Sequence, residues 1–171
     1  AEKLEDLNAH YIRESGTPDL VRDLLPFLNR LGLEDLDEGR VAKAVETLKP
    51  RSRTMADMAQ QAAFYFQEEI VYEEQGDRKF LKGNVLELME DIAGRLRNMM
   101  DFSRAGLEKI FAAFLEEKQI KLGKIAQPIR VALTGRTASP GLFEVMEVLG
   151  RDRVLSRLDR AVDHIRSKTQ G

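Results

Sequence analysis

The most informative segment of this chain is LGKIAQPIRVALTGRTASPGL, which spans residues 122–142. Apolar residues recur at helical spacing in its first half. This spacing predicts a short helix over residues 125–133, whose apolar stripe is made by Ile125, Ile129, Ala132 and Leu133. Gly123 and Gly135 bracket the helix as breakers. Pro128 is expected in its first turn, where a missing backbone N–H costs little.

The second half of the segment, residues 134–140, reads as a polar loop that ends at the start of another helix. Ser139 is a good N-cap for that helix, and Pro140 suits its first position. We therefore expect a helix–loop–helix corner with backbone N–H groups at a helix N-terminus, a layout suited to phosphates or nucleotide bases. The side chains that this corner presents are Arg130, Thr134, Arg136 and Thr137.

Helical spacing continues through the rest of the chain, and no segment reads as a convincing strand, so we expect an all-α fold. A helix is expected to begin with Thr17 as its N-cap and Pro18 at its first position, and Pro26 should kink or split it. Thr54, Asn84 and Ser103 are expected as further N-caps. The other predicted helices cover residues 3–14, 40–48, 54–63, 84–100, 103–118, 140–149 and 152–166.

Residues 64–66, Phe-Tyr-Phe, form an aromatic cluster that is followed by a less regular stretch through Gly76. Aromatic side chains near basic residues can stack nucleotide bases. Helical spacing and the acidic neighbours Glu68, Glu69, Glu73 and Glu74 favour a place in the core instead. The break in the helical pattern here predicts two small helical subdomains.

Composition places the chain among ordinary globular proteins. It has 171 residues, of which 43% are hydrophobic and 33% charged, and it contains no cysteine. The absence of cysteine excludes disulfide and thiolate chemistry and suits a cytoplasmic protein. No apolar run approaches membrane-spanning length, and the first residues, AEKLEDL, are too charged for a signal peptide. We expect a monomer without a membrane partner.

Charge is distributed unevenly along the chain. From Lys121 onward, ten basic side chains face five acidic ones, a local net charge of +5 in a chain whose total is −2. A basic third on an acidic body is expected where one end of a protein meets an anion. The alternative is a solvated helix face with local ion pairs, and charge by itself favours this alternative.

No catalytic constellation is visible. With no cysteine and only His10 and His164, a nucleophile and its base would depend on an isolated histidine. Zinc sites need several closely spaced His or Cys residues, and phosphate-binding or dinucleotide-binding glycine loops have characteristic spacings; neither pattern occurs. We therefore predict no catalytic residue, no metal and no cofactor in this chain.

Three segments resemble the C-terminal part of bacterial-type glutamyl-tRNA synthetases. They are KLEDLNAHYIR at residues 3–13, LKPR at 48–51 and AQPIRVALTGRTASPGLFEVMEVLGRDRVLSRL at 126–158, in the family's order and at family-like spacing. The signatures of the family's catalytic domain are missing. The resemblance implies the anticodon-binding region of a glutamate–tRNA ligase, a class I enzyme whose ATP and magnesium sites lie in a separate N-terminal domain.

The resemblance also implies the organisation and the partners of the chain. Residues 1–16 would be the tail of a stem-contacting region, followed by anticodon-binding subdomains at residues 17–66 and 67–171. The expected partners are glutamate tRNA and the N-terminal catalytic domain of the same protein. Unpaired anticodon bases would be read by hydrogen bonds and stacking, as is typical of RNA recognition.

Arg51 is the most specific site residue that the resemblance implies. It follows Pro50, so its guanidinium is expected to project from a loop as a fixed fork of donors. The matching family arginine reads the third anticodon base, which is cytosine in glutamate tRNAs and guanine in glutamine tRNAs. Cytosine offers acceptors at O2 and N3, whereas guanine opposes the arginine with donors at N1 and N2.

Other residues of the corner match family positions around the remaining anticodon bases. Arg130, Ser139 and Leu142 are expected to line that pocket, although Ser139 would also serve as an N-cap and Leu142 could be plain core. Arg136 and Thr137 are expected to contact the RNA backbone rather than bases. The full set of expected backbone contacts is Arg53, Lys124, Thr134, Arg136, Thr137 and Arg151.

The main alternative is a helical protein–protein interaction module whose basic end meets an acidic partner. Both readings predict salt-sensitive binding, but only the first predicts discrimination between tRNA species. A paralogue that charges a non-cognate tRNA is a further possibility, against which Arg51 argues because it matches the discriminating type. A free-standing enzyme is disfavoured by the lack of a catalytic constellation.

Overall fold

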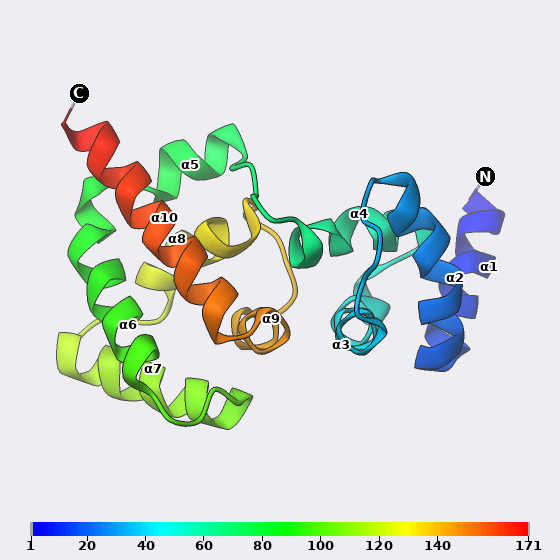
Figure 1. The fold of residues 1–171 in the computed structure, drawn as a ribbon, viewed down its shortest axis with the longest axis horizontal. Helices are drawn as coiled ribbons and strands as arrows, with labels where there is room; N and C mark the ends of the chain where they lie inside the picture. Colours follow the sequence, from blue (N-terminus) through cyan, green and yellow to red (C-terminus); the bar gives the residue numbers. More distant parts are fainter. Residues whose placement is uncertain (1, 171) are drawn as a thin grey trace. The chain divides into compact units, whose positions relative to one another are not determined.

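A computed structural model of the chain describes residues 2–170. Within this range the chain forms ten α-helices and two short 3-10 helices and contains no β-strand, which confirms the expected all-α fold (Figure 1). Two compact units, Ala1–Glu69 and Ile70–Gly171, each have their own core. Among the residues described, no helix combines the length and the apolar character needed to cross a membrane.

The first unit contains α1 (Glu2–Glu14), α2 (Thr17–Arg30), α3 (Glu38–Leu48), the 3-10 helix η1 (Lys49–Arg51) and α4 (Met55–Phe66). Helices α2, α3 and α4 pack against one another. Helix α1 adds Ala9 and Ile12 to their core, whereas Leu4 and Leu7 stay exposed. The fully buried large side chains of this unit include Leu20, Leu24, Leu28, Leu48, Met58 and Tyr65.

Helix α2 differs from its prediction at its N-cap and at Pro26. Gly16, rather than Thr17, is its N-cap, and the Thr17 hydroxyl donates a hydrogen bond to the Glu46 carboxylate on α3. Pro26 does not split the helix, which continues past it. Pro26 and Arg22 are exposed, so the Arg22 carbonyl that loses its helical partner can be hydrated instead.

Side-chain caps start the other two core helices of this unit. The Asp37 carboxylate accepts a hydrogen bond from the Gly39 N–H at 2.8 Å, so α3 begins at Glu38, ahead of its expected start at residue 40. Thr54 caps α4 as predicted, because its hydroxyl accepts from the Asp57 N–H at 3.0 Å. Each cap satisfies a backbone donor that has no partner within its helix.

The aromatic cluster at the end of α4 belongs to the core, as predicted. Phe64, Tyr65 and Phe66 are all buried, and the ring centroids of Phe64 and Tyr65 lie 4.1 Å apart. The Tyr65 hydroxyl shares a 2.8 Å hydrogen bond with the Thr47 hydroxyl on α3. These rings are therefore committed to packing and are not placed to stack nucleotide bases.

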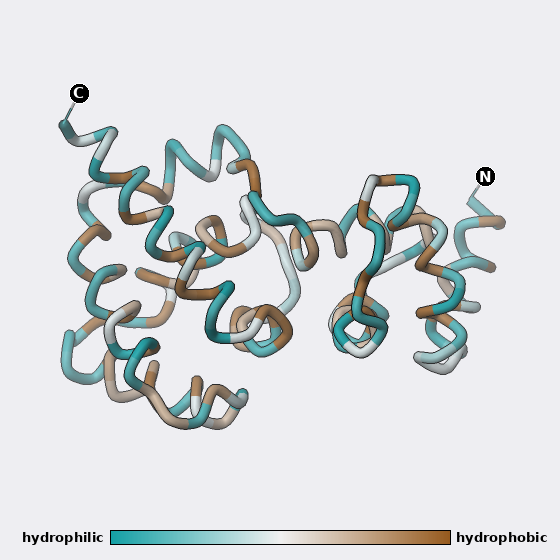
Figure 2. The backbone as a smooth tube through the Cα atoms, in the orientation of Figure 1, coloured by the Kyte–Doolittle hydropathy of each residue, from teal (hydrophilic) through white to brown (hydrophobic). Residues whose placement is uncertain are grey.

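The second unit contains α5 (Glu74–Phe80), the 3-10 helix η2 (Gly83–Val85), α6 (Leu86–Asn98), α7 (Arg104–Lys118), α8 (Gly123–Thr134), α9 (Leu142–Leu149) and α10 (Arg151–Thr169). Helix α10 packs against α6, α8 and α9 (Figure 1). Hydrophobic and hydrophilic residues alternate along α6 and α10, as amphipathic helices require (Figure 2).

Helix α5 corrects the expectation of an irregular stretch through Gly76. Its seven residues, EQGDRKF, include one large apolar side chain, so they carry no helical apolar stripe. The helix is held by tertiary packing instead. Gly76 is buried, and a Cβ atom at this position would lie 3.2 Å from both Val131 and Thr137 side chains. A glycine at position 76 lets α5 approach the Val131 and Thr137 side chains closely, and this contact offsets the low helix propensity of glycine.

Helix α8 is the buried centre of the second unit. The predicted stripe is buried, and the core extends beyond it to Pro128, Val131 and Thr134. Because α8 begins at Gly123, Pro128 lies inside the helix, which corrects its expected place in the first turn. The carbonyl that Pro128 leaves unbonded belongs to Lys124, an exposed residue near the helix start, where water can reach it.

The expected N-caps of α6 and α7 have different outcomes. Ser103 caps α7 as predicted, because its hydroxyl accepts a hydrogen bond from the Gly106 N–H at 3.2 Å. Asn84 is not a cap. It lies inside η2, and Val85 is the N-cap residue of α6 without a side-chain hydrogen bond. A 3-10 turn thus replaces the side-chain cap at this helix start.

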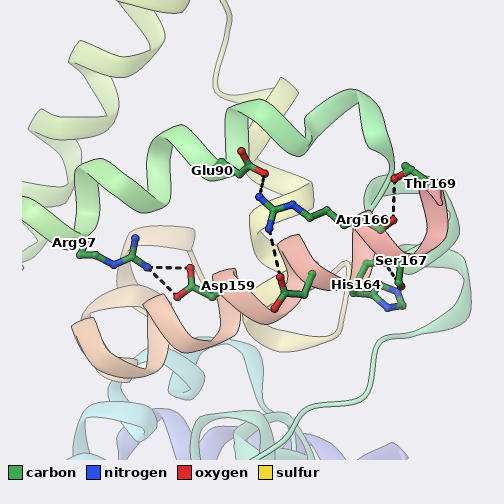
Figure 3. A network of polar contacts seen from close by, with 8 residues as sticks. Glu90, Arg97, Asp159, His164, Arg166, Ser167 and Thr169 are labelled. Atoms are coloured by element: carbon green, nitrogen blue, oxygen red, sulfur yellow. Dashed lines mark hydrogen bonds and ion pairs between the residues drawn. The ribbon is translucent and has the colours of Figure 1, made fainter.

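Some of the charge in the C-terminal third is used in ion pairs inside this unit. Arg166, one of the basic residues after Lys121, pairs with Glu90. Asp159, an acidic residue of the same third, pairs with Arg97, and both pairs join α6 to α10 (Figure 3). These pairs are about half exposed, so each adds little stability. The charge asymmetry along the sequence is therefore partly a set of local ion pairs, the alternative that charge by itself favoured.

Arg157 is the one long basic side chain of α10 that is buried among the residues described, with 6% exposure. Its Nη1 donates to the Leu133 carbonyl at 2.7 Å. This carbonyl lies in the last turn of α8, where carbonyl groups lack helical partners. A positive charge there interacts favourably with the helix dipole. Arg157 therefore holds α10 against the end of α8, close in sequence to the corner.

Asp77 ties α5 to the end of α10. Its Oδ1 accepts hydrogen bonds from His164 Nε2 at 2.8 Å and Lys168 Nζ at 2.7 Å. Burial raises the pKa of Asp77, but the hydrogen bonds from Lys168 and His164 outweigh it, so the pKa lies below its ordinary 3.8. A carboxyl with a lowered folded-state pKa stabilises the fold above its unfolded-state pKa and loses this effect as the pH falls through the folded-state value.

Replacing Asp77 with asparagine is therefore expected to reduce stability at neutral pH and to weaken its decline in acid. The loss at neutral pH should be roughly 0.2–1 kcal/mol, as for partly exposed ion pairs. Urea denaturation followed by circular dichroism, from about pH 7 down to about pH 3, measures both effects. Glu74→Gln removes a more exposed ion pair of α5 and should change the pH dependence less. Identical acid profiles for Asp77→Asn and the wild type would contradict the prediction.

Candidate nucleic-acid interface

The corner between α8 and α9 is shaped by Gly135. This residue ends α8 in the left-handed conformation, with a φ of +77°, as its expected role as a breaker requires. Its N–H donates to the Val131 carbonyl at 2.8 Å. A Cβ at this position would lie 2.2 Å from the Val71 carbonyl oxygen, so the segment before α5 is seated directly against the turn.

Thr134 supports the same turn from inside. It is buried, and its hydroxyl donates to the Arg130 carbonyl at 2.8 Å and accepts from the Arg136 N–H at 3.0 Å. These bonds fold the first residues of the loop back onto the helix. The structure thus places Thr134 beneath the surface of the corner, with its hydroxyl used within the loop.

Glu73 joins the corner to the start of α5. Its N–H donates to the Gly135 carbonyl at 2.7 Å, and its carboxylate accepts from the Thr137 N–H at 3.4 Å. The first part of the loop is therefore anchored at Gly135 and Thr137 by one residue more than sixty positions away in the sequence. This anchoring makes the corner a defined surface rather than a mobile connection.

Arg130 has a fixed side chain at this surface. Its Nε donates to the Ser139 hydroxyl at 2.8 Å, and its Nη1 donates to Gln127 Oε1 at 2.9 Å. Gln127 Nε2 in turn donates to the Thr137 carbonyl at 3.3 Å. The half-buried guanidinium is thus held between helix α8 and the loop, a preorganised arrangement for a group that binds a base edge or a phosphate.

Ser139 does not cap the following helix, which corrects its expected role as an N-cap. Helix α9 begins at Leu142 with Gly141 as its N-cap residue. The Ser139 hydroxyl instead donates to the Pro140 carbonyl and accepts from Arg130, both at 2.8 Å. Leu142 is buried in the first turn of α9, with 6% exposure. The structure therefore brings Arg130 and Ser139 into contact and places Leu142 at the edge of the core.

The expected backbone contacts of this unit lie in different surroundings. Lys124 is exposed in the first turn of α8, and Arg136 and Thr137 are half-buried in the loop. Arg151 lies at the start of α10, where its Nη2 donates to the Met99 carbonyl and its guanidinium carbon lies 5.7 Å from the centre of the Phe102 ring. Arg151 thus fixes the segment between α6 and α7.

Arg51 and Arg53 belong to the first unit. Arg51 ends the 3-10 helix η1 and is exposed, and no ion pair or side-chain hydrogen bond of its guanidinium occurs within residues 2–170. Its carbonyl accepts from Gln61 at 3.2 Å, and its neighbour Ser52 is buried, so the backbone under Arg51 is fixed. Arg53 pairs with Asp6 at 3.0 Å on the surface.

Two residues that shape the interface were not identified from the sequence pattern. Gln127 lies three positions before Arg130, a spacing at which helical side chains meet, and this signal could have found it. Glu73 lies in a segment that reads as irregular and acidic, and no local signal points to its contact with residues 135 and 137. Over the part of the chain that is described, no group of three or more His, Cys, Asp or Glu side chains could hold a metal ion.

The fixed Arg130 at the helix–loop–helix corner offers a guanidinium that can bind a base edge or a phosphate. The family model described as the anticodon binding domain matches residues 19–162. This match covers most of the chain, and the chain belongs to the anticodon binding domain family.

The curated relatives agree with the resemblance inferred from the sequence. Glutamate–tRNA ligases from Syntrophobacter fumaroxidans and Geobacter sulfurreducens are 45% and 43% identical to this chain over 164 residues. Each alignment covers 96% of this chain and 35% of the relative, so the chain spans about a third of the length of the curated relatives it matches.

A solved structure shows the same fold. The crystal structure of a glutamate tRNA ligase from Elizabethkingia meningosepticum, in complex with its amino acid, matches with a TM-score of 0.87 at 21% identity. The match covers 96% of this chain and 32% of that chain. At this identity the likeness supports the fold, and the sequence relatives support the family.

Proposed function

We propose that this chain is the anticodon-binding region of a cytoplasmic glutamate–tRNA ligase and that it binds the anticodon of glutamate tRNA. One observation carries the proposal: the family match at residues 19–162 contains Arg51, Arg130, Ser139 and Leu142, the four residues expected at the anticodon. The attachment of glutamate, with its ATP and magnesium, is assigned to a catalytic domain of the parent protein.

Arg51 is proposed to read the third anticodon base. Its exposed guanidinium on a fixed 3-10 turn can donate to O2 and N3 of cytosine, whereas guanine at that position would oppose donors with donors. A mismatched pair of donors loses hydrogen bonds and leaves polar groups desolvated, which is an efficient means of discrimination. Arg51 is therefore expected to favour tRNAs with cytosine at this position.

The corner is proposed to hold the neighbouring bases and their phosphates. Arg130 is already held by its hydrogen bonds to Ser139 and Gln127. Binding of RNA to its guanidinium would therefore cost little further side-chain entropy, which supports this role. Lys124, Arg136 and Thr137 are proposed as backbone contacts in this unit and Arg53 in the other. The Thr134 hydroxyl and Arg151 Nη2 make hydrogen bonds inside the chain, and we propose that both residues support the interface from beneath.

Titration of the 171-residue chain with glutamate tRNA, at low and moderate salt, tests this function. The comparison ligand is the same tRNA with the third anticodon base changed from cytosine to guanine, which isolates one base. Binding should weaken by roughly 1–3 kcal/mol, about 5- to 150-fold, on this change. Equal, salt-fragile binding of both RNAs would contradict anticodon reading and favour a generic basic surface or an acidic protein partner.

A further inference from the structure

Helix α5 and the turn that follows it carry a basic group that lies outside the predicted interface. Arg78, Lys79 and Lys82 line, together with Gln75, a surface depression of about 330 Å³. All three basic residues are exposed. None of them was a candidate from the sequence, because their segment shows no helical apolar stripe and is preceded by acidic residues.

The charge of this group is only partly neutralised within the chain. Arg78 pairs with Glu74 at 2.8 Å, and both side chains are largely exposed, so water and salt screen the pair. Asp77 on the same helix is turned toward His164 and Lys168 on α10. Within residues 2–170, neither Lys79 nor Lys82 has an ion pair, and Lys79 only lies over the Phe80 ring at 5.3 Å. A surplus of positive charge therefore remains at the depression.

Helix α5 connects this group rigidly to the corner. At its start, the Glu73 N–H bonds to the Gly135 carbonyl at 2.7 Å, and Gly76 packs against Val131 and Thr137. With a rise of 1.5 Å per residue, Lys79 lies about 9 Å along the helix axis from Glu73. This separation is short on the scale of an RNA strand, so a strand bound at the corner can reach the basic group with its phosphates.

We propose that Arg78, Lys79 and Lys82 bind the phosphodiester backbone of the RNA whose bases are read at the corner. The inference rests on the proposed function and adds a second, sequence-independent contact to it. Lys79 and Lys82 supply point charges without the fixed fork of an arginine, so these two lysines are expected to contribute affinity and not base discrimination. Its continuity with the corner favours RNA over an acidic protein segment as the partner.

The test compares the double variant Lys79→Gln/Lys82→Gln with the control Lys109→Gln/Lys121→Gln. Both remove two exposed lysines of the second unit that have no ion pair within the described residues. Binding of glutamate tRNA is measured by fluorescence anisotropy over a series of salt concentrations. For the first variant, the negative slope of log K against log salt should become less steep by roughly 1.4–1.8. Its preference for cytosine over guanine at the third anticodon base should stay unchanged.

The outcomes separate the two proposals. If the wild type discriminates between the two RNAs but the Lys79→Gln/Lys82→Gln variant has the wild-type salt slope, this inference is overturned. The proposed function would then still stand. An equal loss of slope in the control, or a changed base preference in the variant, also overturns it. A wild type that binds polyglutamate through Lys79 and Lys82 but does not bind tRNA overturns both proposals and identifies an acidic protein partner. Thermal unfolding by circular dichroism verifies that the variants are folded.

Discussion

Gly135→Ala is expected to lower the free energy of unfolding by about 2–4 kcal/mol, because two costs combine at this residue. The positive φ of 77° is unfavourable for any residue with a Cβ, at a cost of about 1–2 kcal/mol. The new Cβ would also lie 2.2 Å from the Val71 carbonyl oxygen, a backbone atom that can move only with its segment. That movement would strain the 2.7 Å hydrogen bond between the Glu73 N–H and the Gly135 carbonyl.

Urea denaturation of the variant measures this loss, and tRNA titration measures its consequence for binding. Gly94→Ala is the matched control. Gly94 lies within α6, and a Cβ there would meet nothing within 4 Å, so alanine should stabilise the protein by about 0.5–1 kcal/mol through helix propensity. Two glycine-to-alanine changes in one unit are thus predicted to have opposite signs. A Gly135→Ala protein as stable as the wild type would show that the turn is not constrained as described.

Arg51→Gln is expected to reduce the preference for cytosine over guanine at the third anticodon base by roughly 1–3 kcal/mol, about 5- to 150-fold. Glutamine offers both a donor and an acceptor, so it opposes guanine less than a guanidinium does. Fold stability should hardly change, because the Arg51 side chain is exposed and makes no ion pair within the described residues. The measurement is competition between glutamate tRNA and its cytosine-to-guanine variant for the wild-type and mutant chains.

Arg13→Gln is the control for this substitution. Arg13 is also an exposed arginine of the first unit, on α1, and its side chain makes no hydrogen bond or ion pair within residues 2–170. Arg13→Gln removes the same charge as Arg51→Gln but leaves η1 unchanged. Any effect should therefore be an equal loss of affinity for both RNAs and not a change in the preference for cytosine. Unchanged discrimination in Arg51→Gln would show that the third base is read elsewhere.

The arrangement of helices follows closely from local sequence patterns. Repeats of apolar residues at three- and four-residue spacing predict most of the helices because one face of a helix must be buried. Thr54 and Ser103 are recognised as caps because each bonds to a backbone N–H three residues away. The resemblance of three segments was sufficient to identify the family, which the match at residues 19–162 confirms.

Predicted caps were wrong where a side chain bonds to a partner on another element. Ser139 has the residue type and neighbours of an N-cap, but its hydroxyl accepts a hydrogen bond from Arg130 on α8. Thr17 similarly bonds to Glu46 on α3. Local propensity predicts what a residue does in an isolated segment. Its free energy is small, so contacts made on packing in the folded chain can outweigh it.

The residues of this chain, taken in order, therefore specify its helices, its cores and its family, because these depend on spacings of a few positions. Tertiary structure decides the shape of the candidate interface, because the partners involved lie far apart in sequence. Glu73 reaches Thr137, and Arg157 reaches the Leu133 carbonyl, only after the helices have packed. Helix α5, with its basic group beside the corner, exists for the same reason: its packing on α8 supplies the stabilisation that seven residues without an apolar stripe lack.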